Sequence, residues 1–224
     1  MCGRINVSDH QGVQELLNWL NIPLHPNQFE SRFNIAPSAI LNTIFASPTP
    51  SLVPMEWGII PPWAKPNQFN RPLANARAET IWEKPSFKSL IKTNRTIIPV
   101  NGFYEWQRTN STKKPFYIHA SESNALALGA IYQITPDKKY QCCVVTTAAN
   151  QTMSTVHDRM PVILSPEVMK DWLFSNDTEH LNQLMLPCAD NKVTITPVSP
   201  YVNNARNEGP QCLAPAEKQK DLFS

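Results

Sequence analysis

The chain has 224 residues, 42% of them hydrophobic, and carries a formal net charge of +2. This length and apolar content fit one compact domain, and the near-balanced charge excludes a polycation that binds nucleic acid through its overall charge. Any nucleic-acid contact must therefore come from clustered Arg and Lys side chains. The 21 Pro and only 6 Gly indicate many fixed turns in a rigid, non-repetitive fold.

Four short helices are predicted from capping residues and hydrophobic spacing. The first has Ser8 as its N-cap and Gln11 at the capping-box position. The others are expected after Ser86, from Ser165-Pro166-Glu167 with Pro at the first helical position, and over about 178–186.

Strand-like runs dominate the rest of the chain. They cover residues 96–100, 102–107, 116–120, 125–134, 141–148, 161–164 and 193–198. Turns are expected at Lys113-Lys114-Pro115 and at 136–139. Because strands outnumber helices and do not alternate with them regularly, we expect an α+β fold: a single domain of mostly antiparallel β-sheets, barrel-like, with a few flanking helices. This domain is expected to span 1–213 and to be followed by a polar tail over 214–224.

The cysteines form an odd-numbered set without Cys-x-x-Cys spacing, namely Cys2, Cys142, Cys143, Cys188 and Cys212. This pattern favours reduced thiols in a cytoplasmic protein over a disulfide framework or a zinc site, so we expect no metal and no cofactor. No apolar stretch is long enough to cross a bilayer, and no signal segment precedes Cys2. We therefore expect no membrane association.

The first residues, Met1-Cys2-Gly3, suggest a reactive N-terminus. Methionine before a residue as small as cysteine is usually removed, which would leave an α-amine and a thiol on adjacent carbons of Cys2, with ordinary pKa values of about 7.7–8.0 and 8.5. Such a pair can attack one aldehyde carbon twice, because the amine forms an imine and the thiol then closes a five-membered thiazolidine ring. An internal cysteine cannot do this.

Four separated segments each place a polar group in an apolar or proline-fixed setting. They are Cys2-Gly3-Arg4, residues 75–79 (NARAE), residues 102–106 (GFYEW) and residues 157–161 (HDRMP). Taken singly, each has an ordinary structural explanation: Glu105 could face solvent from a strand, and His157 could be a structural histidine.

Taken together, these segments resemble the SRAP (SOS response-associated peptidase) domain family, whose members cross-link to abasic sites in single-stranded DNA. Further matches run from residue 2 to about residue 213. They are residues 33–37 (FNIAP), Trp57-Gly58, Pro62-Trp63, residues 146–150 (TTAAN), residues 202–204 (VNN) and Gly209-Pro210. The resemblance implies a covalent DNA–protein link, lyase activity and autoproteolytic removal of Met1. Methionine aminopeptidase would give the same mature end, so both routes to Cys2 stay open.

The same resemblance assigns the catalytic roles. Cys2 is the nucleophile whose amine and thiol both end on the sugar C1′, Glu105 and His157 are the proton-transfer pair, and Asn75 orients the abasic sugar. A carboxylate and an imidazole suit these steps, because the ammonium must lose a proton and the sugar ring oxygen must gain one.

The expected partner is single-stranded DNA that contains abasic sites, bound by a monomeric protein that would associate with the nucleoid if it is bacterial. Arg4, Arg77 and Arg159 are candidates for phosphate contacts, with ion pairing inside the protein as the alternative. The other candidate DNA contacts are Asn34, Trp63 and Trp106; the tryptophans could stack on bases or pack in the core.

Two other functions fit parts of the sequence. An N-terminal-nucleophile hydrolase of the glutamine amidotransferase type also begins Met-Cys-Gly, and Asn101-Gly102 could form its oxyanion hole. Arg4 stands where that family usually has an apolar residue, and the chain has no room for an acceptor domain. A single-strand-binding module with an incidental Cys2 is the third interpretation.

Overall fold

The computed structural model describes all residues except 1, 26–27, 47–48, 65–70, 109–112 and 217–224. Its first sheet joins, in spatial order, β13 (Val193–Pro197), β8 (Lys113–Ala120), β7 (Gly102–Arg108), β1 (Ile5–Val7) and β2 (Arg32–Ile35). Every pairing in this sheet is antiparallel. The strand that starts the chain is therefore an interior strand of the sheet.

The second sheet is larger and closes on itself. Its order is β11 (Arg159–Pro161), β10 (Tyr140–Ala148), β4 (Ser51–Trp57), β3 (Ile40–Phe45), β6 (Arg95–Val100), β9 (Leu126–Ile134) and β12 (Ile163–Leu164). An additional antiparallel pairing between β10 and β9 completes a barrel, while β4 and the short β5 (Asn75–Arg77) pair with β10 in parallel. The expected α+β class and barrel-like sheets are thus confirmed.

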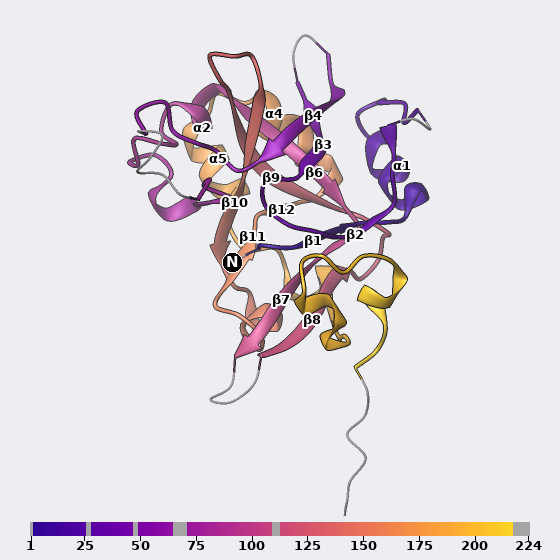
Figure 1. Ribbon diagram of the computed structural model, residues 1–224. Coiled ribbons are helices and arrows are strands. Elements are labelled where there is room, and N and C mark those ends of the chain that lie inside the picture. The colour runs from indigo at the N-terminus through magenta and orange to yellow at the C-terminus, as the bar shows by residue number, and fades with distance from the viewer. Residues whose placement is uncertain (1, 26–27, 47–48, 65–70, 109–112, 217–224) are drawn as a thin grey trace, which may run out of the picture.

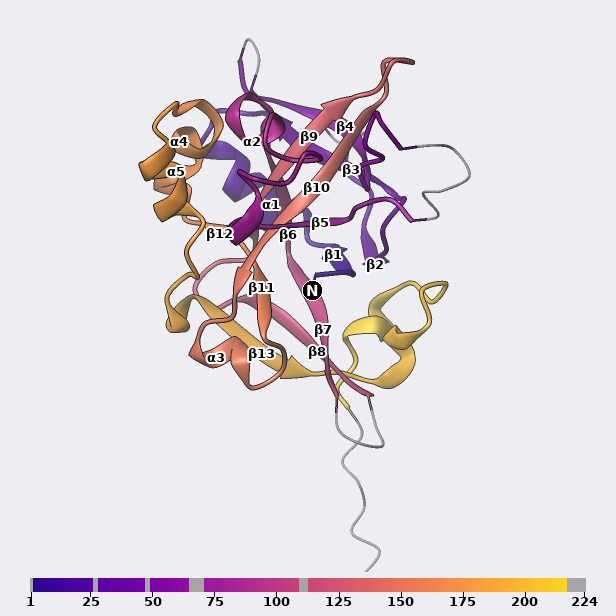
Figure 2. The same cartoon turned by 90° about the vertical axis from the view of Figure 1, so that its left-hand side faces the viewer.

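The helices are short and lie outside the sheets (Figures 1 and 2). They are α1 (His10–Asn18), α2 (Leu90–Thr93), α3 (Gln151–Ser154), α4 (Met169–Phe174) and α5 (Thr178–Leu184). Five 3₁₀ turns complete the described elements: η2 (Ala78–Thr80), η3 (Pro166–Val168), η4 (Asp190–Lys192), η5 (Pro200–Asn203) and η6 (Pro210–Leu213). In Figure 2, α4 and α5 lie together on one flank, and η5 and η6 lie beside β7 and β8.

The barrel separates two hydrophobic cores, because successive side chains of a strand point to opposite faces. On β10, Cys142 and Val144 join one core, whereas Cys143 and Val145 join the other. The core that holds Cys143 and Val145 is covered by α1, α4 and α5. The other, which we call the inner core, lies between the two sheets and includes Cys2. The adjacent cysteines therefore face opposite ways, as neighbouring residues of a strand do.

Two local expectations are wrong. The N-cap of α1 is Asp9, whose carboxylate accepts the Gln11 N–H at 3.0 Å, and not Ser8. The Ser8 hydroxyl is turned towards Asn6, to which it donates at 2.8 Å, so it does not accept from the first turn of the helix. Lys113-Lys114-Pro115 is not a turn: β8 already begins at Lys113, where the pairing with Arg108 extends the hairpin.

The other predicted helices and strands are confirmed to within a few residues, with one split, whereas β1 to β5 and α3 were not predicted. The run over 161–164 forms two strands, β11 and β12, that pair with different partners, β10 and β9. The last residues of the expected tail, 217–224, lie outside the described residues.

Gly102 offers a test of how closely the β7–β8 hairpin is packed. A Cβ at this position would meet the Ile118 carbonyl oxygen and the Tyr117 ring at 2.5 Å. We expect Gly102→Ala to lower the free energy of unfolding by about 1–3 kcal/mol, the usual cost of overpacking. Urea denaturation measures this loss. Gly129→Ala is the matched control, because its nearest neighbour, Val162 Cγ1, would lie at 3.1 Å and can shift; equal losses in both variants would contradict this packing account.

Candidate active site

The beginning of the chain is held beside β7 by backbone pairing. Ile5 lies opposite Phe103, and the Tyr104 N–H donates to the Arg4 carbonyl at 2.9 Å. If this antiparallel register is continued from Ile5 towards the N-terminus, the chain runs alongside Tyr104 and then Glu105. Cys2 is completely buried in the inner core. The start of the chain lies beside β11 in both views (Figures 1 and 2).

The Cys2 thiol is kept neutral by its surroundings. Burial raises the pKa of the thiol far above its usual range, and the negative charge of Glu105 raises it further, while the positive charge of the chain terminus and a backbone hydrogen bond at Arg4 lower it. Glu105 is itself 3% exposed. A buried carboxylate therefore acts electrostatically on the candidate nucleophile.

Asn75 approaches the same core from the opposite sheet. It lies on β5, opposite Val144 of β10 in a parallel pairing, and Val144 packs in the inner core with Cys2. Its side-chain oxygen, Oδ1, is buried and has no hydrogen-bond partner among the described residues. Such a buried acceptor is costly unless a ligand supplies a donor, so this atom is suited to bind a hydroxyl.

His157 lies in the loop between α3 and β11. The Arg159 N–H donates to its Nδ1 at 2.9 Å, and Oδ1 of Asp158 lies 2.8 Å from the same nitrogen. This loop is tied to the first sheet, because the Gln107 side chain on β7 donates to the Thr155 carbonyl at 2.8 Å. The fold thereby brings the His157 loop to the strand that carries Glu105.

Arg159 is engaged within the protein. Its guanidinium forms a two-pronged ion pair with Glu79, with N–O distances of 2.5 and 2.9 Å, and donates to the Thr146 carbonyl at 2.7 Å. The hydrogen bond from Arg159 lowers the pKa of the Glu79 carboxyl. Its Nε is nevertheless buried without a partner among the described residues. Arg77, two residues before Glu79 on the same segment, is exposed.

Arg4 is fixed by Asn34 and by the chain near η5. Its Nη1 donates to Asn34 Oδ1 at 2.6 Å and to the Val202 carbonyl at 3.0 Å. Asn34 is buried, and its amide nitrogen donates to the carbonyls of Asn204 and Asn207. Asn34 therefore positions Arg4 within the protein.

The two candidate tryptophans differ in setting. Trp63 is 61% exposed. Trp106 is half-buried, and its indole N–H donates to Asn203 at 2.6 Å. Arg4 Cζ and Lys113 Nζ lie 5.5 and 4.7 Å from the centre of a Trp106 ring. The sequence did not predict that Asn203 or Lys113 contacts Trp106, because only the fold brings these residues together.

The oxyanion hole of a hydrolase is not formed by Asn101. Its Oδ1 accepts the N–H groups of Ser8 and Asp9, and its Nδ2 donates to the carbonyls of Asp9 and Asn124. This amide holds the start of α1, so it has no donor left for a substrate. The structure thus offers no support for the amidotransferase interpretation.

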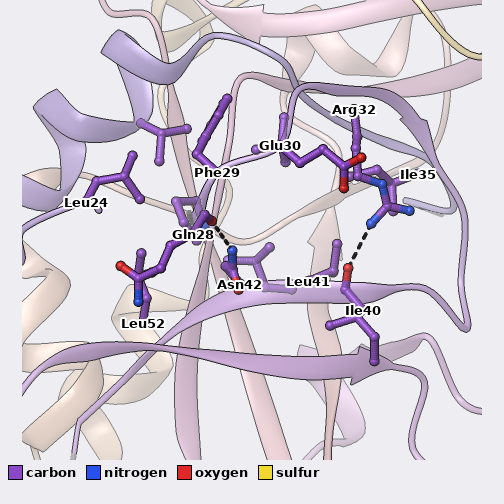
Figure 3. Close-up of a pocket in the computed structure, with 14 residues that line it drawn as sticks. Leu24, Gln28, Phe29, Glu30, Arg32, Ile35, Ile40, Leu41, Asn42 and Leu52 are labelled. Atoms are coloured by element: carbon purple, nitrogen blue, oxygen red, sulfur yellow. Dashed lines mark hydrogen bonds between the residues drawn. The ribbon is translucent and has the colours of Figure 1, made fainter. Parts of the chain in front are cut away.

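A small hollow of about 250 Å³ lies away from these residues, between α1, β2 and β3 (Figure 3). Its polar groups are used internally: Arg32 donates to the Ile40 carbonyl at 3.0 Å, and Asn42 donates to the Gln28 carbonyl. None of the candidate site residues lines it.

Within the described part of the chain there is no cluster of His, Cys, Asp and Glu side chains that could hold a metal ion. None of the described helices is long and apolar enough to span a membrane.

Comparison with known proteins gives the same family that the sequence motifs resemble. The model of the SOS response associated peptidase (SRAP) family matches residues 1–205. The abasic site processing protein YoqW of Bacillus subtilis is 37% identical over 222 residues, which cover 95% of this chain and 99% of YoqW. The abasic site processing protein HMCES of Rattus norvegicus is 29% identical over 93% of this chain and 70% of its own length.

Solved structures share the fold. A crystal structure of a Bacteroides thetaiotaomicron protein superposes with a TM-score of 0.82 at 21% identity, over 96% of this chain and 100% of that chain. A phage-related protein of Bordetella bronchiseptica superposes with a TM-score of 0.70 at 24% identity, over 88% of this chain and 94% of that chain.

The charge of Glu105 should be visible in the reactivity of Cys2. Burial and Glu105 both raise the pKa of the thiol, so Glu105→Gln removes one of the two effects and moves thiolate formation to lower pH. Iodoacetamide labelling of the Cys2 peptide, followed by mass spectrometry across a pH series, measures this shift. Glu79→Gln removes a carboxylate that does not act on Cys2 and should leave the profile unchanged. An identical profile in Glu105→Gln would show that Glu105 does not act on the thiol.

Proposed function

The chain belongs to the SRAP family, and from this premise we propose that it processes abasic sites in single-stranded DNA by forming a covalent link through Cys2. Relatives that match nearly the whole chain are named abasic site processing proteins, which supports the substrate class. The observation that carries the proposal is the burial of Cys2 beside Glu105, in a core that β5 and the His157 loop also border.

The chemistry needs the α-amine of Cys2, which is part of the Met1–Cys2 peptide bond until Met1 is removed. The description of the family as a peptidase supports autoproteolytic removal. The freed amine attacks C1′ of the abasic sugar, the C1′–O4′ bond breaks, and loss of water gives an imine. The thiol then adds to the imine carbon and closes a thiazolidine, so that one water is lost in total.

Three residues supply the groups that these steps require. Glu105, buried near Cys2, accepts the proton that the ammonium loses before attack. His157 gives a proton to O4′ as the sugar ring opens. Asn75 accepts a hydrogen bond from a sugar hydroxyl through the buried oxygen that has no donor among the described residues. The imine stage would also permit β-elimination at the sugar, which is the proposed lyase activity.

DNA binding is proposed to use a local set of cations and aromatic rings. Arg77 is exposed and lies two residues after Asn75 on the same short strand, which supports a contact with a phosphate next to the abasic sugar. Arg4 and Arg159 offer buried guanidinium edges whose Nε atoms have no partner among the described residues. The exposed ring of Trp63 suits stacking on an unpaired base.

The nucleophile is tested by Cys2→Ala. An alanine amine can form only a reversible imine, because it has no thiol to close the ring. We therefore expect no heat-stable adduct with abasic single-stranded DNA when denaturing gels and intact mass are measured. Cys188→Ala is the control that removes a partly exposed thiol elsewhere and should cross-link normally. A heat-stable adduct of Cys2→Ala at the wild-type yield would rule out the proposed linkage.

The DNA-binding face is tested by Arg77→Ala. Each phosphate contact on a single strand contributes about −0.7 to the slope of log affinity against log salt. Removing Arg77 should weaken binding to intact and abasic strands alike and make the slope shallower by about one contact in fluorescence anisotropy. Arg71→Ala, an exposed arginine outside the proposed site, is the control. An unchanged slope in Arg77→Ala would place the DNA on another face.

A further inference from the structure

The Nδ1 atom of His157 has two neighbours that make opposite demands on it. The Arg159 N–H, at 2.9 Å, can only donate, so it requires a bare Nδ1. The Asp158 carboxylate, with Oδ1 at 2.8 Å, can only accept, so it requires a protonated Nδ1. One nitrogen cannot satisfy both at once. The proton on Nδ1 therefore decides which neighbour His157 binds.

The Arg159 N–H, one of the two neighbours of His157 Nδ1, is held firmly in place. Arg159 is the first residue of β11, which pairs with β10, and its side chain is fixed by Glu79 and by the Thr146 carbonyl. On the other side, Gln107 ties the loop to β7 through the Thr155 carbonyl. The imidazole thus sits between two anchored segments, whereas Asp158 is 87% exposed and free to change its hydrogen bonding.

We infer that Asp158 is a positioning residue for His157: it accepts a hydrogen bond from Nδ1–H and so lets the opposite nitrogen, Nε2, release its proton. This inference rests on the proposed function. An imidazolium that gives its Nε2 proton to O4′ must keep the proton on Nδ1, and Asp158 is the neighbour that can bind that form. As the C1′–O4′ bond breaks, its electron pair stays on O4′, which takes the proton and becomes a hydroxyl, and His157 is left neutral with Nδ1–H facing Asp158.

The Arg159 N–H binds the alternative neutral form, in which the proton sits on Nε2 and Nδ1 is bare. That form can donate a hydrogen bond to the sugar, but giving up its only proton would leave an imidazolate. Asp158 and the Arg159 N–H therefore set the balance between a form that can transfer a proton and one that can only hold the substrate. The same division of roles is seen where a carboxylate orients a catalytic histidine.

The test is the isosteric change Asp158→Asn, read in two ways. Nitrogen NMR of ¹⁵N-histidine-labelled protein reports which ring nitrogen of His157 carries the proton, with His157→Ala identifying the signal. We expect Asp158→Asn to shift the neutral ring towards the Nε2–H form. Because Asp158 is mostly exposed, cross-linking to abasic single-stranded DNA should slow by only about 2- to 5-fold, with unchanged affinity for the DNA.

Two further variants separate positioning from other roles. Asp158→Glu should restore both the NMR signal and the rate, because it returns the carboxylate. Asp137→Asn removes an exposed aspartate from the distant turn between β9 and β10 and should change neither. An unchanged proton position in Asp158→Asn, or a slower reaction explained by weaker DNA binding, would overturn the inference. If the wild-type protein forms no adduct, the proposed function fails, while the NMR measurement still decides the role of Asp158.

Discussion

The position of Cys2 in the candidate site depends on one constraint, the antiparallel pairing of β1 with β7, which holds the start of the chain inside a sheet. The ladder that begins at Ile5 and Phe103 leads Cys2 into the inner core, where the charge of Glu105 acts on it. Chain ends are usually loosely held, and this one is secured by main-chain hydrogen bonds and by burial. A nucleophile at the start of the chain is thereby as firmly placed as one in the middle of a strand.

Several polar atoms at this site are buried at a cost to stability. Arg4 Nε, Asn75 Oδ1 and Arg159 Nε have no hydrogen-bond partner among the described residues. Each such group costs about 1–3 kcal/mol of desolvation. All three residues were candidate site residues on sequence grounds. Unpaired buried atoms on such residues are the pattern expected of a binding site that a ligand completes.

The sequence allowed the long strands to be predicted, because β6, β7, β9 and β10 are rich in apolar, aromatic and β-branched residues. The strands β1 to β4 were not predicted. β5 was not predicted either, since three residues carry no periodicity and become a strand only by pairing with β10. The candidate catalytic residues came from motif identity alone. The motifs did not predict which of these residues contact one another. The Glu79–Arg159 ion pair and the hydrogen bond from Arg4 to Asn34 each join residues from separate elements.

The central claim is that both groups of Cys2 end on one sugar carbon, and hydride reduction of the adduct tests it most directly. Protein freed of Met1 would be incubated with abasic single-stranded DNA and treated with borohydride, and the mass of the Cys2 peptide–DNA adduct would be measured. A thiazolidine has no C=N bond, so the account predicts a mass equal to peptide plus DNA minus one water, unchanged by borohydride. An adduct that gains two hydrogens on reduction would be an imine and would contradict the account.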